Sequence, residues 1–571
     1  MAAGQPGAAE VAASTGEGRP LPLLASLKKE WCKGHLSAKQ VQEFAMGAEA
    51  QGAYGMTATA SAGTRGKNPQ NIHRTLASLF GTPKGCPSMT WSEVPTKSGK
   101  FMHPFFLPHM SFASLAAECP ELFQSAMLGP EGGCSAFWTM MHDTPFVREH
   151  PVLAPDNKHK TIPLGFYGDG GAFSHQDSLL VFTYNSLLGT GRTMSKRYVI
   201  TCVKKSDIIP GTLESIFKII GWSFNVLVTG LWPEEDWMKR PLDQHGYLAN
   251  GLRGCLSQVR GDWEFYTSIF GFPKWNEAKN MCWMCGASAA GPMTFADCSP
   301  AALWRATKRS HESYVAELDA KGKELPALFR HTIGLRLETI MVDVLHTCDL
   351  GFGAHLIGNV FNECILAKVW STGPMADNIA GLNAALKVWY IENQTTSLLK
   401  GDLTMDRIRS RQNNWPKIKA KAAATRHLAP FALHLARAHL ADRRIQALCQ
   451  MLCEFYQMME RQGMFLDEEA KERMPRLGQR MCGLYAQLAA TSLAAGHKRW
   501  KMTPKVHLLL HLCEWQGPSV GNPRFFWVYS DEDLVGSMIE VAESCHAKTM
   551  AATALMKWSI LVFDPDVREL L

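Results

Sequence analysis

The sequence of 571 residues predicts a mixed α/β unit joined to a long all-α region. Two runs rich in β-branched and aromatic residues, 178–188 and 197–209, are bounded by Gly, Ser and Asp, which is typical of buried strands. From about residue 350 to 511, Ala, Leu, Met, Gln and Arg recur with a helical period and no strand pattern interrupts them. We therefore expect a mixed sheet with a large all-α insertion, preceded by a loop-rich N-terminal domain.

The composition sets limits on what the chain can do. With 46% hydrophobic and 19% charged residues it is an ordinary globular chain, and its net charge of +7 permits an anionic partner without requiring one. No apolar run approaches the roughly 18 residues of a membrane span, and the first residues lack the layout of a secretory signal. We expect an intracellular protein with no membrane partner, whose 16 cysteines are free thiols or metal ligands.

The elements divide the chain into five predicted parts. Ser37 and Gln40 form a capping-box pattern at the start of a short helix. Residues 212–233 read as a helix that Pro233 ends, and residues 251–272 as a strand that ends at Asp262 with a helix behind it. The predicted parts are a disordered leader (1–22), an N-terminal mixed or helical domain (23–156), a mixed α/β core (157–349), the helical insertion (350–511) and a C-terminal part of the core (512–571).

Three carboxylates stand at positions that suit a metal site. Asp169 lies in "YGDGG", at the predicted end of a strand, although Asp and Gly both weaken strands. A turn is the simpler interpretation, but flanking glycines also let metal ions and the backbone of a ligand approach closely. Asp262 is a metal ligand or the N-cap of the following helix. Glu532, in "SDED", is a ligand or part of a solvated helix start, with Asp531 and Asp533 as competitors.

A Cys-x-x-Cys motif predicts a zinc site. Cys282 and Cys285 have the spacing with which two thiolates hold one Zn²⁺, and Asp343 with His346, three residues apart, would complete four ligands. A redox motif and simple core packing are the alternatives. His507 and His511 lie one helical turn apart, and we assign them a supporting role in packing or near DNA.

Taken in order, these motifs resemble those of DDE transposases of the CACTA-like and related eukaryotic cut-and-paste elements. The resemblance covers roughly residues 160–550. It implies an RNase H-like sheet with Asp169, Asp262 and Glu532 as the catalytic triad. The last motif also includes Pro504, His507, His511, Phe526 and Trp527, whereas Asp533 and Val535 stand where relatives often have Arg and Asn.

The resemblance implies a nuclear enzyme that cuts and joins double-stranded DNA, with a homo-oligomer as a possible assembly. Two cations about 4 Å apart, Mg²⁺ or Mn²⁺, would activate the attacking oxygen and stabilise the leaving one. Two alternatives stay open: a domesticated, inactive derivative that binds DNA or protein, and a metal-dependent nuclease on the same fold.

A basic segment, residues 406–427, is the predicted DNA contact. After Asp406 it contains no acidic residue, and Trp415 offers a flat surface on which a base can stack. A solvated helix face is the alternative. The predicted contact residues are Arg407, Arg409, Arg411, Trp415, Lys417, Lys419 and Lys421.

Overall fold

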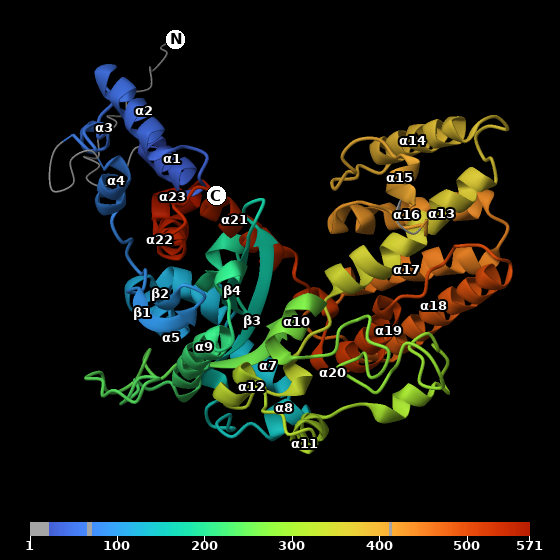
Figure 1. The fold of residues 1–571 in the computed structure, drawn as a ribbon, viewed down its shortest axis with the longest axis horizontal. Coiled ribbons are helices and arrows are strands. Elements are labelled where there is room, and N and C mark those ends of the chain that lie inside the picture. The colour runs from blue at the N-terminus through green and yellow to red at the C-terminus, as the bar shows by residue number, and fades with distance from the viewer. Residues whose placement is uncertain (1–21, 65–70, 410–413) are drawn as a thin grey trace, which may run out of the picture. The chain divides into compact units, whose positions relative to one another are not determined.

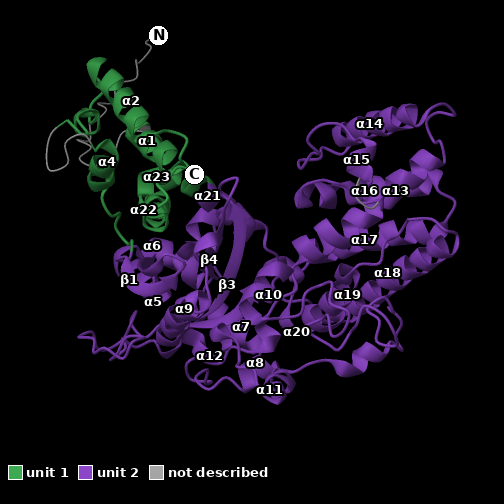
Figure 2. Cartoon of the chain, viewed as in Figure 1, with its two compact units in different colours: residues 1–86, 540–571 green, residues 87–539 purple. Residues whose placement is uncertain are grey.

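The computed structural model describes residues 22–64, 71–409 and 414–571. The chain forms two compact units, 1–86 with 540–571, and 87–539 (Figure 2). The predicted leader lies outside the described residues except for Pro22, and so does Arg411 of the basic segment. The predicted boundaries at 156, 349 and 511 all fall inside the second unit.

The first unit is helical and joins both ends of the chain. The capping box is confirmed, because the Ser37 hydroxyl accepts a hydrogen bond from the Gln40 amide at 3.2 Å. An ion pair of 2.9 Å links Lys28 to Asp564. The helices of this unit are α1 (Pro22–Cys32), α2 (Ala38–Ala50), α3 (Thr57–Ala60), α4 (Ile72–Phe80), α22 (Met550–Phe563) and α23 (Pro565–Glu569).

The second unit contains a hairpin that the sequence did not reveal. Strands β1 (Thr90–Thr96) and β2 (Gly99–Phe105) pair antiparallel in a region we expected to be irregular. Prolines and glycines in residues 80–87 and 102–109, Pro104 among them, indicated a loop, because proline cannot donate to a ladder. A two-stranded ribbon has two edges, which is where strand prolines are tolerated.

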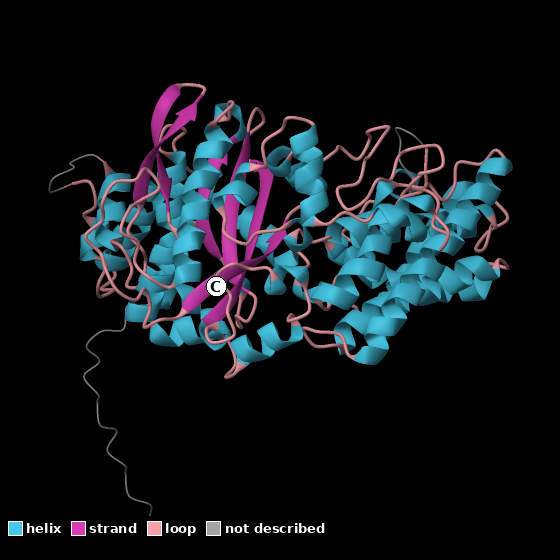
Figure 3. Cartoon of the chain, turned by 90° about the horizontal axis from the view of Figure 1, so that it is seen from below, coloured by secondary structure: helices cyan, strands magenta, loops and turns pink. Residues whose placement is uncertain are grey.

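The main sheet has the order β5-β4-β3-β6. Figure 3 shows the strands among the helices that surround them. Strands β3 (Thr161–Ala172), β4 (Ser178–Ser186) and β5 (Tyr198–Lys204) form an antiparallel meander. Strand β6 (Arg253–Arg260) pairs parallel to β3, and a further parallel bridge joins Val259 to Ile340 beyond β6. The predicted mixed α/β unit is therefore confirmed.

Helix α9 (Thr212–Thr229) covers one face of this sheet. Phe166 and Phe182 of the sheet meet Phe217 of the helix edge-to-face, at ring-centroid distances of 6.3 and 5.2 Å. The helix ends at Thr229 rather than at Pro233, because Gly230 adopts a left-handed conformation with φ 69° that terminates it.

The predicted all-α region is also confirmed, since residues 354–520 contain helices joined by loops (Figure 1). A π-helical segment, Leu345–Gly353, leads into it. In the described part of the chain, no helix combines the length and the apolar character that a membrane span requires. The remaining helices are α5 (Pro108–Glu118), α6 (Pro120–Phe123), α7 (Gly133–Met140), α8 (Pro145–Arg148), α10 (Trp263–Phe270), α11 (His311–Ala320), α12 (Ala327–His331), α13 (Ala354–Leu366), α14 (Met375–Glu392), α15 (Met405–Ile408), α16 (Ala422–His439), α17 (Arg443–Arg461), α18 (Glu468–Ala494), α19 (Pro504–His511), α20 (Gly517–Val520) and α21 (Tyr529–Glu543).

Candidate active site and metal centre

Asp169 lies in β3, three residues before the strand ends at Ala172. The strand stays in register with β4 to Ala172, so "GDGG" is not a turn, and it lies within the last five residues of β3. The glycines are required by packing: a Cβ on Gly168 would stand 2.2 Å from the Phe265 ring of α10, and one on Gly171 would stand 2.3 Å from Ile539 of α21. The two neighbouring helices can therefore approach the strand around Asp169.

Asp169 and Asp262 follow the same registered pair of two neighbouring parallel strands, and Asp262 lies two residues beyond the end of β6. The last registered pair between β3 and β6 is Tyr167 with Arg260, and each aspartate follows two residues later. Parallel strands bring equivalent positions to the same edge of a sheet. Both aspartates line one cavity of about 320 Å³. Asp262 is also the N-cap of α10, where its Oδ1 accepts from the Phe265 amide at 2.6 Å.

A single hydroxyl links Asp169 to Glu532. Tyr167 Oη lies 3.2 Å from Asp169 Oδ2 and 2.8 Å from Glu532 Oε1, so the two carboxylates are immediate neighbours although 363 positions separate Asp169 from Glu532 in the sequence. Tyr167 and Asp169 are two residues apart in a strand, so their side chains point to the same face, the one opposite α9. Sequence reasoning missed Tyr167, although this alternation could have indicated it.

The neighbours of Glu532 have other roles. Asp531 is fully buried and bonds Arg197 Nε at 2.8 Å and Arg260 Nη2 at 3.2 Å, which fixes the start of α21 against the sheet. Asp533 is exposed, and no ion pair within 4 Å involves it among the described residues. Of the three acidic residues in "SDED", Glu532 is therefore the one that meets Asp169.

The carboxylates repel one another in this partly buried site. Burial and then the charges of Glu532 and Asp262 raise the pKa of Asp169 to about 7, against the opposing hydrogen bond from the Gly170 amide. Burial, followed by the charge of Asp169, also holds the pKa of Tyr167 well above its ordinary value. A bound cation would relieve this repulsion.

Asp343 and His346 lie beside Asp262 in this carboxylate site and, contrary to the prediction, are not among the residues that gather around Cys282 and Cys285. Asp343 Oδ2 accepts from His346 Nδ1 at 2.9 Å, and His346 Nε2 points toward Glu532 Oε1 at 3.8 Å. Asp343 Oδ1 also accepts from the Val528 amide at 3.1 Å, just before α21. Although burial acts to lower it, the pKa of His346 rises to about 9 because Asp343, Glu532 and Asp262 stabilise the imidazolium.

The two cysteines meet His507 and His511 instead. Candidate ligand atoms of Cys282, Cys285, His507 and His511 all lie within 4.8 Å of one another, and all four residues are buried. Cys285 Sγ lies 3.3 Å from His507 Nε2 and 3.4 Å from His511 Nε2. The i, i+4 spacing on α19 places both imidazoles on one face, a signal that the sequence contained and that we assigned only to a supporting role.

This cluster has the composition of a structural zinc site. Two thiols and two imidazoles match the Cys₂His₂ ligand set of structural sites, and Trp304 and Trp515 pack against the two histidines. Burial opposes ionisation, yet hydrogen bonds from Cys285 and the two histidines hold the pKa of Cys282 well below its ordinary value. The arrangement could bind a metal such as zinc and would then join the 282–285 loop to α19.

The predicted DNA segment is partly engaged in local structure. Arg407 Nη1 donates to the Lys400 carbonyl at 2.7 Å, and Arg409 Nη2 to the Asn414 carbonyl at 2.8 Å. These two guanidinium groups therefore support the fold of their own loop. Lys419 and Lys421 are exposed, and Lys417 is half-buried.

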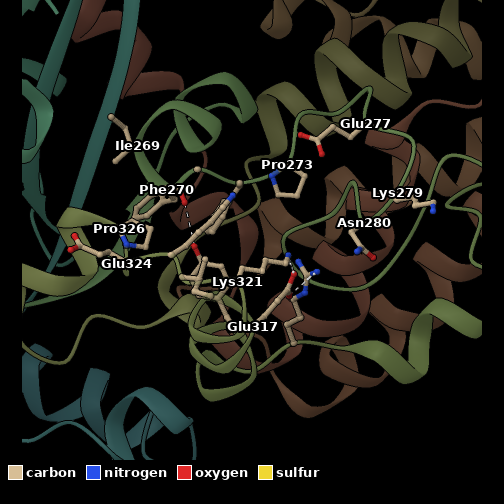
Figure 4. Close-up of a pocket in the computed structure, with 16 residues that line it drawn as sticks. Ile269, Phe270, Pro273, Glu277, Lys279, Asn280, Glu317, Lys321, Glu324 and Pro326 are labelled. Carbon is tan, nitrogen blue, oxygen red and sulfur yellow. Dashed lines mark hydrogen bonds and ion pairs between the residues drawn. The ribbon is translucent and has the colours of Figure 1, made fainter. Parts of the chain in front are cut away.

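A separate cavity of about 470 Å³ lies beside α10 and α11 (Figure 4). Three of its charged residues pair with one another, since Glu317 forms ion pairs with Arg309 at 3.1 Å and with Lys321 at 2.5 Å. None of the three carboxylates lines it. We therefore place the candidate active site at the sheet edge.

Comparison with known proteins adds no assignment to this geometry. No protein-family model matches the chain, and a search of curated proteins also gave no match.

Proposed function

We propose that this chain is a DDE-type transposase with an RNase H-like core, which cuts and joins DNA in the nucleus. The observation that carries the proposal is the convergence of Asp169, Asp262 and Glu532 from three distant parts of the sequence. The order β5-β4-β3-β6, with β6 parallel to β3 and the bridge to Ile340 beyond it, supports an RNase H-like sheet.

The donor atoms fit divalent cations of the Mg²⁺ type. Three carboxylates from separate elements supply oxygen ligands and leave room for water, which Mg²⁺ prefers. Asp262 uses one oxygen as an N-cap and Glu532 uses one for Tyr167, which leaves the second oxygen of each for a cation. When bound, such cations activate the attacking oxygen and stabilise the leaving oxygen of a phosphodiester.

The chain's own residues position these carboxylates. Tyr167 holds Asp169 and Glu532 together, and the pair of Asp531 with Arg197 and Arg260 fixes the start of α21. Asp343 orients His346 so that its Nε2 faces Glu532. A protonated His346 can donate a hydrogen bond to a phosphate oxygen or to the departing strand.

Nicking of supercoiled plasmid DNA in the presence of Mg²⁺ or Mn²⁺ tests this function. We expect the wild type to nick, and Asp169→Asn, Asp262→Asn and Glu532→Gln each to lower the rate by at least about 100-fold, which corresponds to several kcal/mol of lost transition-state stabilisation. Asp156→Asn, at an exposed position away from the site, is the matched control and should nick normally.

The alternatives give different results in the same experiment. A wild type that binds DNA but does not nick it would be the inactive derivative, a reading that Asp533 and Val535 favour because they depart from the pattern of relatives. Nicking without joining of a cut end to a second DNA would indicate a nuclease. Nicking that survives all three substitutions would contradict the proposed site.

A further inference from the structure

A group of lysines lies next to the carboxylate site and is not neutralised by the protein. Lys505, in the first turn of α19, lines a cavity of about 210 Å³ together with Asp262, Asp343 and His346. Lys417 belongs to the loop before α16, and Lys501 precedes α19. Within the described ranges, no ion pair of 4 Å or less involves any of these three lysines.

The three lysines act on one another electrostatically. The charge of Lys417 acts on Lys505. Burial and the charge of Lys501 lower the pKa of Lys417. All three cations also disfavour protonation of His355, whose Nδ1 is held 2.9 Å from the Pro416 carbonyl.

The packing keeps these cations in place. Lys505 lies against the π-helical segment, where a Cβ on Gly351 would stand 2.8 Å from its side chain. The backbone of Lys417 packs equally closely on Gly358 of α13, at 2.6 Å from a Cβ built there. The α19 N-terminus adds the positive end of a helix dipole, and the Thr503 hydroxyl at its N-cap is buried without a partner in the described structure.

We propose that Lys417, Lys501 and Lys505 bind the phosphodiester backbone of the DNA that enters the carboxylate site. Half-buried cations without a protein partner are stabilised by a ligand of negative charge, and a DNA backbone offers one at each nucleotide. The inference rests on the proposed function, because it takes DNA as the substrate. It also moves the predicted DNA contact from Arg407 and Arg409, which hold their own loop, to Lys417 and two lysines from another part of the chain.

The salt dependence of DNA binding tests this inference. Affinity of the full chain for a fluorescein-labelled duplex of arbitrary sequence is measured over a series of KCl concentrations without divalent cations. Each lost phosphate contact should reduce the slope of log affinity against log salt by about 0.9. We expect the triple variant Lys417→Gln, Lys501→Gln, Lys505→Gln to flatten the slope by about 2 to 3.

Two further variants make the result specific. The control triple Lys158→Gln, Lys160→Gln, Lys218→Gln removes the same charge from lysines that form no ion pair among the described residues, and should keep the wild-type slope. Replacing Lys417, Lys501 and Lys505 by Arg keeps the charge and should also keep the slope, and this variant serves if the Gln triple folds poorly.

Two outcomes overturn the inference: an unchanged slope in the Gln triple, or equal flattening in the control triple. The Arg triple gives a third such outcome. If it has the wild-type melting temperature but its salt slope is as flat as that of the Gln triple, the inference is also overturned. Failure of this inference is distinguishable from failure of the proposed function. If the wild type nicks DNA but the Gln triple keeps the wild-type salt slope, only the lysine site is contradicted. If the Gln triple flattens the slope but the wild type does not nick, only the proposed chemistry is contradicted.

Discussion

Asp349 is a fully buried carboxylate held by two tyrosines. Tyr456 and Tyr529 each donate to one of its oxygens at 2.5 Å. Burial nevertheless raises its pKa to about 7, against the opposing effect of these hydrogen bonds. An unfolded aspartate has a pKa of about 3.9, so the folded protein binds the additional proton between these values. The contribution of Asp349 to the free energy of unfolding should therefore be fully present below about pH 4 and decrease as the pH rises toward 7.

Asp349→Asn removes this titration and provides a direct measurement. We expect the urea-unfolding midpoint of the variant, relative to wild type, to rise between pH 5 and 7.5, with a change in unfolding free energy of at most a few kcal/mol. Any constant effect of the substitution cancels in the comparison between pH values. Asp156→Asn, at an exposed position, should show no such trend. A difference between wild type and Asp349→Asn that does not vary with pH would contradict the assignment.

Individual residues show how far the sequence could lead. Motif order predicted Asp169, Asp262 and Glu532, and strand register explains why the first two lie close together. Alternation along the strand could have placed Tyr167 on the same face as Asp169, but its contact with Glu532 and the position of Lys505 depend on which distant segments pack together. The prediction of the residues that accompany Cys282 was wrong for the same reason. Both Asp343 with His346 and His507 with His511 have suitable spacing, and only tertiary packing distinguishes the two pairs.

At the scale of elements, the Cys/His cluster joins the 282–285 loop to α19. Trp283 contacts Trp263 of α10 and stacks on Phe272, so the loop that carries the thiols packs against the helix that follows β6. Helix α19 in turn carries Lys505 toward the carboxylate site. A metal in this cluster would therefore stabilise the position of α19, since metal binding contributes directly to folding free energy.

The zinc prediction is tested with two cysteine variants. We expect purified wild type to contain one zinc ion per chain by inductively coupled plasma mass spectrometry, and Cys282→Ser to lose it together with part of its thermal stability. Cys449→Ser, another buried cysteine that lies outside the cluster, should keep its zinc. If the wild type contains no zinc, or if both variants contain the same amount, the four residues do not bind zinc and only pack in the core.

At the scale of the whole chain, the order of helices and strands was more predictable than the way in which segments combine into the two compact units. The strand runs at 178–188 and 197–209, the helix after them and the long helical region all appear where periodicity placed them. The pairing of the chain's two ends in one unit could not be predicted, because it depends on contacts such as Lys28 with Asp564 between residues 536 positions apart. The hairpin of β1 and β2 was hidden by its prolines.

The central proposal is that Asp169, Asp262 and Glu532 form one divalent-cation site. A crystal of the full chain grown with MnCl₂ tests it most directly, because Mn²⁺ can replace Mg²⁺ at oxygen ligands and scatters anomalously. We predict anomalous-difference density bounded by oxygens of all three carboxylates, with none in a matched crystal of Asp169→Asn. Anomalous density at another place would contradict the proposal. Carboxylates without bound Mn²⁺, with His346 Nε2 paired to Glu532, would also contradict it.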